Sequence, residues 1–261
     1  MDFIKNKRLH DSLYLKENQY KDPKETFKFA SRLIDKIAFN KRVKLLDVGC
    51  AAGDFLKYLT LTKDLNKYEF FGTDISRELI EASKKNVPQA KFIKYDFSKF
   101  DNNFDELFNY KFDIMTMFGV HSCFDNLEWI KNISYLLNSG GKAILWGILN
   151  PYPYDVLMRV KRSDSSEYES GWNIHSLDSI KKEAEIQNLI VEVINYQPNL
   201  DIQRNEDDFL RTWTINLGNN DHMKRSENVN NELLLETDRK TIYTNATRII
   251  HDWCFCEFIK P

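Results

Sequence analysis

The sequence lacks a long apolar run and an excess of positive charge. No stretch approaches the ~18 consecutive apolar residues of a membrane-spanning helix, and the first five residues lack the apolar core of a signal peptide. Lysine and arginine total 37 against 39 acidic residues, and the basic pairs are scattered along the chain. Nucleic-acid binding usually needs a clustered basic face. We therefore expect a cytoplasmic protein with neither a membrane nor a nucleic-acid partner.

Cysteine is also scarce, and its spacing does not match a metal site. The four cysteines are Cys50, Cys123, Cys254 and Cys256. Cys254 and Cys256 would share one face of a strand, but no second pair is present to complete a zinc site. Buried free thiols are the favoured interpretation, and no bound metal is expected.

What the chain does contain is an alternation of strand and helix patterns. Strand patterns occur at 43–48, 69–73, 91–95, 112–118, 142–147 and 190–194, and helix patterns at 54–62, 77–86, 126–138 and 177–189. Such alternation predicts an α/β fold with a doubly wound, mostly parallel seven-stranded sheet, in which 249–258 supplies an antiparallel last strand. We expect one domain over 1–261, with a helical N-terminal cap at 1–40 and a core at 41–150.

A turn of small residues joins the first core strand to its helix. Gly49 to Gly53 allow a ligand to approach the backbone, where the free N–H groups of a helix start point at it. The phosphate-binding pattern G-x-G-x-x-G fits badly, because its second and third glycine positions hold Ala51 and Asp54. An acid would repel a pyrophosphate, so this turn favours a ligand with a cationic part.

The next strand pattern ends at Asp74, which is suited to an adenosine ribose. A carboxylate there can accept hydrogen bonds from both vicinal hydroxyls. NAD sites also use a carboxylate that binds the ribose hydroxyls, so Asp74 alone does not indicate which cofactor binds. The alternative is that Asp74 only caps the helix that follows Ser76.

The segment Asp47-Val48-Gly49-Cys50-Ala51-Ala52-Gly53 resembles motif I of the class I S-adenosylmethionine (SAM) dependent methyltransferases, D/E-x-G-x-G-x-G. Ala51 replaces the middle glycine, and the resemblance extends over about the first 150 residues. It implies SAM as cofactor, S-adenosylhomocysteine (SAH) as product, and a cofactor site that includes Asp47, Gly49, Cys50, Ala51, Gly53, Asp74 and Ile75.

The third and fourth core strands carry further parts of this resemblance. Asp96 and Phe97 follow the strand at 91–95, and in the family this acid faces the adenine amino group while its neighbour's N–H faces the ring. An exposed loop aspartate is the alternative. Asp47, Asp74 and Asp96 together close three successive strands, which favours SAM over NAD.

Phe118, Gly119 and His121 follow the strand at 112–118 and resemble motif IV, where the methyl group meets the acceptor. Phe118 and Gly119 would border the reaction centre. With an ordinary pKa near ~6.5, His121 would be able to take a proton from an acceptor hydroxyl or amine. A histidine that only packs or hydrogen-bonds this loop is the alternative.

Beyond residue 150 no pattern identifies the acceptor. Residues 151–175 are basic and aromatic enough for a lid over an anionic, ring-bearing acceptor, or for a solvated surface, and 199–244 is a long insertion. Asn150 to Tyr154 resembles the Asn-Pro-Pro-Tyr signature of amino-methylating nucleic-acid enzymes, but its second proline is displaced and we interpret the likeness as accidental.

We predict a SAM-dependent methyltransferase that moves a methyl group to oxygen or nitrogen of a small polar acceptor, such as an activated sugar or other surface-polysaccharide precursor. One alternative is a SAM- or SAH-binding regulatory or scaffold protein without turnover. The other is an NAD-dependent oxidoreductase, which Asp54 at a pyrophosphate argues against. The oligomeric state is left open, with a homodimer among the possibilities.

Overall fold

The computed structural model describes residues 6–7, 13–16, 20–37, 39–100, 109–151, 153–161, 163–171, 173–195, 201–204, 212–216, 234–235, 241–245 and 252–261. The chain divides into two compact units. The first comprises Met1–Ile194 and Cys254–Pro261, and the second comprises Asn195–Trp253. Each unit is described by itself below.

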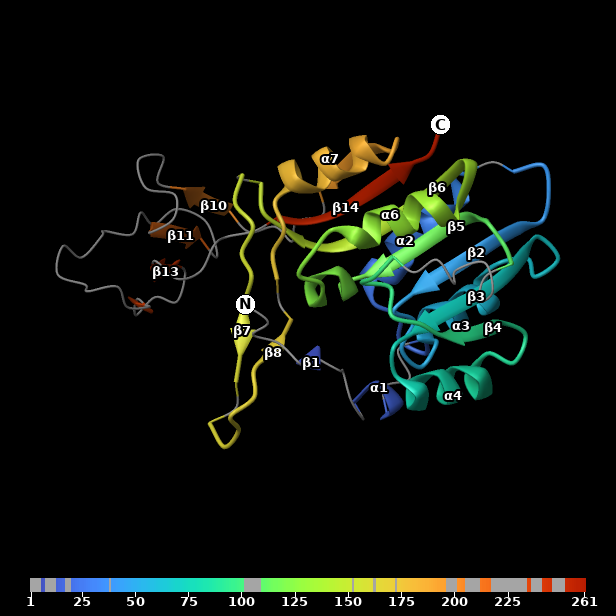
Figure 1. The fold of residues 1–261 in the computed structure, drawn as a ribbon, viewed down its shortest axis with the longest axis horizontal. Helices are drawn as coiled ribbons and strands as arrows, with labels where there is room; N and C mark the ends of the chain where they lie inside the picture. Colours follow the sequence, from blue (N-terminus) through green and yellow to red (C-terminus); the bar gives the residue numbers. More distant parts are fainter. Residues whose placement is uncertain are drawn as a thin grey trace. The chain divides into compact units, whose positions relative to one another are not determined.

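A seven-stranded sheet forms the centre of the first unit (Figure 1). Its parallel register is set by pairs such as Leu45 with Phe70 on one side and Leu45 with Ile114 on the other. The strand order is β4-β3-β2-β5-β6-β14-β9. The strands are β2 (Val43–Val48), β3 (Tyr68–Asp74), β4 (Lys91–Lys94), β5 (Phe112–Phe118), β6 (Leu137–Leu149), β9 (Ile190–Asn195) and β14 (Asp252–Ile259).

The last strand, β14, runs antiparallel to β6. The Gly140 N–H donates to the Lys260 carbonyl at 2.8 Å, and the Lys260 N–H donates to the Gly141 carbonyl at 3.1 Å. The beginning of β6 therefore lies beside the end of β14. The predicted fold class, a mostly parallel seven-stranded sheet with an antiparallel last strand, is confirmed.

Helices cover this sheet (Figure 1). Two of them begin at a serine whose hydroxyl accepts a backbone N–H, which satisfies a donor at the helix start. Ser76 Oγ accepts from Leu79 N at 3.3 Å, and Ser176 Oγ accepts from Ser179 N at 3.0 Å. The helices are α1 (Leu13–Lys16), α2 (Glu25–Asp35), α3 (Asp54–Thr62), α4 (Arg77–Asn86), the 3₁₀ helix η1 (Val120–Cys123), α6 (Glu128–Leu136) and α7 (Leu177–Ile186).

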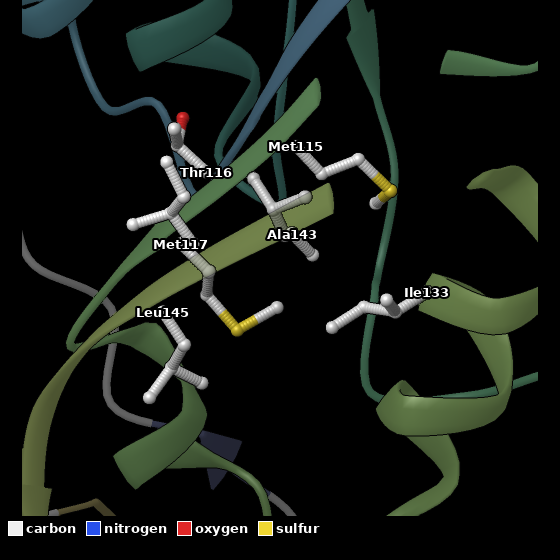
Figure 2. Close-up of a pocket in the computed structure, with 8 residues that line it drawn as sticks. Met115, Thr116, Met117, Ile133, Ala143 and Leu145 are labelled. Carbon is white, nitrogen blue, oxygen red and sulfur yellow. The ribbon is translucent and has the colours of Figure 1, made fainter. Parts of the chain in front are cut away.

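The alternation of side chains along β5 assigns its two faces to different layers. Met115 and Met117 belong to the same core cluster as Ile133 of α6. Figure 2 shows these two methionines on the side of Ile133, whereas the hydroxyl of Thr116 points away from it. The side chains that line this region leave no room for a water molecule, so it is packed core and not a ligand site.

The expected helix at 126–138 ends two residues early. Leu137 begins β6, where it pairs with Phe112. Its carbonyl accepts a hydrogen bond from the Lys260 ammonium at 2.9 Å. The C-terminal segment therefore draws Leu137 and Asn138 into the sheet, a tertiary effect that outweighs local helical periodicity.

The N-terminal part contributes α2 to the packing of the first unit. Phe27 packs on Phe55 with ring centroids 5.0 Å apart and on Phe118 at 5.6 Å, and Phe29 stacks on Phe255 at 4.8 Å. Since Phe118 ends β5, α2 covers the carboxyl end of that strand. The expected cap is not wholly helical, because β1 (Asn6–Lys7) pairs with β8 (Glu169–Ser170), which also pairs with β7 (Arg159–Val160).

The second unit is built around an antiparallel sheet with the order β10-β11-β13-β12. Its strands are β10 (Asp201–Arg204), β11 (Thr212–Asn216), β12 (Leu234–Leu235) and β13 (Thr241–Asn245). The insertion predicted at 199–244 lies in this unit. Across the described part of the chain, no helix has the length and apolarity needed to cross a bilayer.

Candidate active site

The turn between β2 and α3 folds back tightly on β3. The N–H groups of Gly49 and Cys50 both donate to the Thr73 carbonyl, at 2.8 and 2.9 Å. The turn uses left-handed backbone at Gly49 (φ 70°), Ala51 (φ 48°) and Gly53 (φ 85°). A Cβ on Gly49 would lie 2.9 Å from the Val120 Cβ, so only glycine allows the close contact between this turn and η1. We call residues 49–53 the motif I turn.

Asp74 joins the motif I turn to the end of β3. One carboxylate oxygen accepts from Ala51 N at 3.0 Å, and the other accepts from Ser76 N at 2.9 Å. Burial raises the pKa of Asp74, and the backbone hydrogen bonds from Ser76, Ala51 and Ile75 oppose that rise. Each carboxylate oxygen has a second acceptor site, so the group can still receive ligand hydroxyls.

Asp47 is the most deeply buried acid at this edge, with 2% of its surface exposed. Its Oδ1 accepts a hydrogen bond from Thr116 Oγ1 at 2.7 Å. Burial raises the pKa of Asp47 to about 7, the Thr116 bond lowers it, and the nearby charge of Asp74 raises it. Within the described part of the chain, no lysine, arginine or histidine is among the groups that shift this pKa.

Asp96 lies at the end of the next strand, β4. Its Oδ1 accepts from Ser98 N at 3.1 Å and from Ser98 Oγ at 2.7 Å, which fixes the turn after the strand. The neighbouring Phe97 is buried, and its carbonyl accepts from the Asn132 side chain at 2.8 Å. The strand register therefore places Asp74 and Asp96 at the same edge of the sheet.

The end of β5 supplies Phe118 and Gly119. Phe118 meets Phe55 of α3 edge-on, with ring centroids 4.7 Å apart. Gly119 has a left-handed φ of 71° and donates its N–H to the Trp146 carbonyl at 2.8 Å. Both residues therefore lie where α2, α3 and the motif I turn approach β5.

His121 is enclosed by protein. The residue has 0% exposure, and a Cβ on Gly147 would overlap its ring. Burial and the neighbouring His175 lower the pKa of His121 to about 3, with the Ile148 backbone opposing them. The prediction of an ordinary imidazole pKa is wrong, because no water solvates a charged ring there. The base role of His121 stays a prediction, which this burial does not favour.

A model of the methyltransferase domain family matches residues 46–143. That range contains the motif I turn, Asp47, Asp74, Asp96 and the end of β5. The chain therefore contains a methyltransferase domain. A search of curated proteins gave no match.

Solved structures show the same fold at low sequence identity. A SAM-dependent methyltransferase from Clostridium acetobutylicum is 12% identical, with a TM-score of 0.51 over 97% of this chain and 96% of that chain. YcgJ from Bacillus subtilis is 12% identical, with a TM-score of 0.52 over 88% and 97%. SAM-bound CalS10, an amino pentose methyltransferase from Micromonospora echinaspora, is 13% identical, with a TM-score of 0.51 over 93% and 100%.

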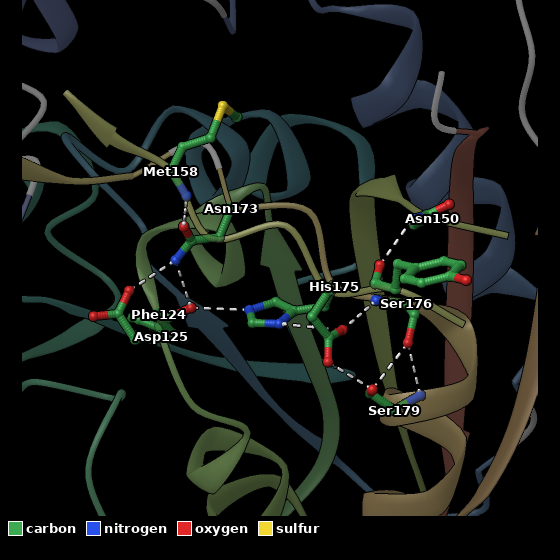
Figure 3. A network of polar contacts seen from close by, with 10 residues as sticks. Phe124, Asp125, Asn150, Met158, Asn173, His175, Ser176 and Ser179 are labelled. Atoms are coloured by element: carbon green, nitrogen blue, oxygen red, sulfur yellow. Dashed lines mark hydrogen bonds and ion pairs between the residues drawn. The ribbon is translucent and has the colours of Figure 1, made fainter. Parts of the chain in front are cut away.

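The segment from Asn150 to Ser176, which we call the strap, is tied to the loop that follows β5 (Figure 3). The Asn173 amide donates to the Phe124 carbonyl at 3.0 Å and to Asp125 Oδ1 at 2.9 Å. The His175 Nε2 lies 2.9 Å from the same Phe124 carbonyl. These bonds hold the strap against the motif IV loop at buried positions.

Both ends of the strap are also fixed. Asp155 accepts from Ser176 N at 2.6 Å and from Ser179 Oγ at 2.7 Å, at the start of α7. The fully buried Asn150 donates its side-chain amide to the Tyr154 carbonyl at 2.8 Å. That amide closes a turn in its own segment, which supports the interpretation that the Asn-Pro-Pro-Tyr likeness is accidental.

Sequence reasoning missed two residues of this site. Thr116 lies within the strand predicted at 112–118, where a hydroxyl between Met115 and Met117 is a signal that one face of the strand differs. Phe27 lies within the predicted N-terminal cap at 1–40, and no local pattern links it to Phe118. Among the described residues, no group of three or more His, Cys, Asp or Glu side chains is arranged to hold a metal ion.

Proposed function

We propose that this methyltransferase transfers a methyl group to oxygen or nitrogen of a small polar acceptor. In this proposal the motif I turn, Asp47, Asp74 with Ile75, Asp96 with Phe97, and Phe118 with Gly119 hold the cofactor. The observation that carries it is Asp47, a carboxyl group buried at the ligand edge of the sheet, on which no cationic side chain of the described residues acts. A buried carboxylate needs a counter-charge, and a cationic ligand would supply it.

The residues present fit SAM better than a dinucleotide. SAM carries a sulfonium and an ammonium group together with a ribose, which match Asp47 and Asp74. The pyrophosphate of NAD would instead meet the buried acids Asp47 and Asp54. Like charges in a poorly hydrated site repel strongly, so the same acids that suit SAM oppose NAD.

When bound, SAM supplies a methyl group already activated by its sulfonium. The chain then has to orient the acceptor and exclude water, and good alignment of two reactants contributes about 7–11 kcal/mol to lowering a barrier. The rings of Phe27, Phe55 and Phe118 pack together at the end of β5 and form an apolar wall. Methyl transfer to an acceptor that is oriented in this way does not require a charged His121.

We further propose an activated sugar, such as a surface-polysaccharide precursor in the cytoplasm, as the acceptor class. Exposed aromatic and basic groups of the strap support this choice, because they suit a ring-bearing anion. Tyr168 is 46% exposed and has the Lys161 ammonium 5.7 Å from its ring centroid. Arg159 is less available, because it pairs with Asp125 at 3.1 Å. CalS10, which has this fold, acts on an amino pentose.

The cofactor site is tested by calorimetric titration of the full chain with SAM, SAH and NAD. Asp74→Ala should weaken SAM binding by about 30-fold or more, since two hydrogen bonds to a charged acceptor are lost. The control is Asp64→Ala, which removes an exposed aspartate from the loop between α3 and β3 and should leave binding unchanged. Unaltered SAM affinity in Asp74→Ala would contradict the assigned ribose site.

The acceptor class is tested separately by SAH release with a panel of nucleotide sugars, simple amines, phenols, proteins and nucleic acids. Release that depends on a nucleotide sugar supports the proposal. Release only with a protein or nucleic-acid acceptor would overturn the small-acceptor proposal and leave the cofactor site intact.

A further inference from the structure

We propose that Thr116 is a positioning residue that favours the ionised form of Asp47, and that the Asp47–Thr116 pair makes the site prefer SAM to its product SAH. The inference rests on the proposed cofactor site. SAM carries one positive charge more than SAH, on the sulfonium. A carboxylate whose ionisation is controlled by the protein can therefore bind the cofactor SAM more tightly than the product SAH.

The strand register brings the two side chains together. Asp47 of β2 lies directly opposite Thr116 of β5, and the two strands are hydrogen-bonded neighbours. Both residues lie on the face opposite Met115 and Met117. Figure 2 shows that the Thr116 hydroxyl points away from the two methionine side chains and from Ile133. Thr116 is 1% exposed and donates to Asp47 Oδ1 at 2.7 Å.

The other groups around Asp47 oppose its ionisation. Asp74 from β3 raises the pKa of Asp47 through its charge. Cys50 of the motif I turn stays a neutral thiol, because burial and then the charges of Asp47 and Asp74 raise its pKa. Among the described residues, the Thr116 hydroxyl is thus the group that favours the charged carboxylate.

The consequence is a cofactor preference that depends on pH. The ionised carboxylate attracts a sulfonium cation, whereas the protonated acid does not. A ligand that binds only the ionised form has an apparent dissociation constant that rises in proportion as this form becomes rarer. SAM affinity should therefore increase as the pH is raised from 6 to 8, and SAH affinity should change less.

The test measures SAM and SAH dissociation constants of wild-type, Thr116→Val and Thr116→Ser chains from pH 6 to pH 9. Without its hydrogen bond, the pKa of Asp47 should rise by about one unit or more, which lowers the ionised fraction at pH 7 about fivefold. Thr116→Val should weaken SAM binding about fivefold at pH 7 and by less than about twofold at pH 9. Thr116→Ser should restore the wild-type profile.

Thr73→Val is the matched control. Thr73 lies on the neighbouring strand β3 and is fully buried, and its hydroxyl has no hydrogen-bond partner among the described residues. This variant also removes a buried hydroxyl, but it should leave the pH profile of SAM binding unchanged. If Thr116→Val and Thr73→Val weaken binding equally at every pH, Thr116 has only a packing role and the proposal is overturned.

The dissociation constants of the wild-type chain test the cofactor site and the role of the Asp47–Thr116 pair separately. Absence of SAM binding at every pH would refute the proposed cofactor site itself. SAM binding that is tight but independent of pH, with SAH bound equally well, would leave the cofactor site standing and refute the role of the Asp47–Thr116 pair.

Discussion

Two aspartates with the same low solvent exposure lie at opposite ends of the central sheet, and their pKa values are shifted in opposite directions. Asp47 near the carboxyl end of β2 and Asp113 at the amino end of β5 are each 2% exposed. Burial raises the pKa of Asp113, but hydrogen bonds from Lys41, the Lys44 backbone and Asn138 outweigh it and lower the pKa below its usual value. Asp47 receives one hydroxyl, and its pKa rises to about 7.

The difference distinguishes a structural acid from a ligand-binding acid. Asp113 has its donors within the fold: Lys41 at 2.8 Å, Lys44 N at 3.0 Å and Asn138 at 2.7 Å. Asp47 lies at the edge where ligands of such sheets bind, and none of the described residues supplies a cation that shifts its pKa. Perturbed carboxyl groups of this kind are more frequent at functional sites than elsewhere.

The largest expected effect is on the pH dependence of stability. The pKa of folded Asp47 is about 7, above the ~3.9 of an unfolded aspartate, so the folded state holds an extra proton between these pH values. Stability therefore falls as the pH rises through this window, and Asp47 contributes a loss of about 3 kcal/mol between pH 4.5 and pH 7. Urea unfolding of wild type and Asp47→Asn should show this slope only in the wild type.

Asp113 should affect the pH dependence of the free energy of unfolding in the opposite direction from Asp47. The pKa of Asp113 is lowered, so the stability it contributes is present above the unfolded pKa and is lost as the pH falls through the folded value. Its slope thus has the opposite sign and lies in the acidic range. Parallel slopes in wild type and Asp47→Asn between pH 4.5 and pH 7 would contradict the state assigned to Asp47.

A smaller effect is expected when the structural acid is removed. Asp113→Ala leaves the Lys44 N–H and the Asn138 amide without their acceptor and should reduce the free energy of unfolding by about 2–3 kcal/mol at pH 7. SAM affinity of the folded variant should stay unchanged. Asp47→Asn should show the reverse, with weaker SAM binding and little loss of stability. Equal loss of SAM binding in both variants would contradict the assignment of Asp113 as a structural acid and Asp47 as a ligand-binding acid.

The smallest effect is expected at His121, a buried titratable group that is packed like a core residue. His121→Leu replaces the ring with an apolar side chain in a fully buried site, and turnover with a confirmed acceptor should change by less than about threefold. General-base catalysis is typically worth about 10²–10⁴-fold. A loss of that size, together with a loss of the pH dependence of turnover, would restore the base role. SAM affinity serves as the control for folding.

Much of the fold was predictable because its signals are local. The strand at Val43–Val48 and the helices at Asp54–Thr62 and Arg77–Asn86 were predicted with their observed ends, since apolar periodicity, a glycine turn and a serine cap mark them. Leu137 and Asn138 were assigned wrongly to a helix. Their strand depends on contacts with Phe112 and Lys260, which the local sequence does not contain.

The candidate site was predictable to the extent that it follows from strand ends. Asp47, Asp74 and Asp96 lie at or near the carboxyl ends of three strands, and parallel strands bring these ends to one edge. The burial and the hydrogen-bond partners of each side chain, and therefore its pKa, were not predictable from the sequence. Whether a histidine faces solvent or the backbone of Gly147, or an aspartate meets lysine or threonine, depends on residues far away in the sequence.

The sequence by itself determined the alternation of strands and helices, the glycine turn that approaches a ligand, and the three acids at the strand ends. These features depend on residue type and short spacing. Only the tertiary structure decided that Thr116 donates to Asp47, that Phe27 packs on Phe118, and that His121 is buried. Burial and long-range pairing set the electrostatic environment of each group, and both arise when segments separated by many residues pack together.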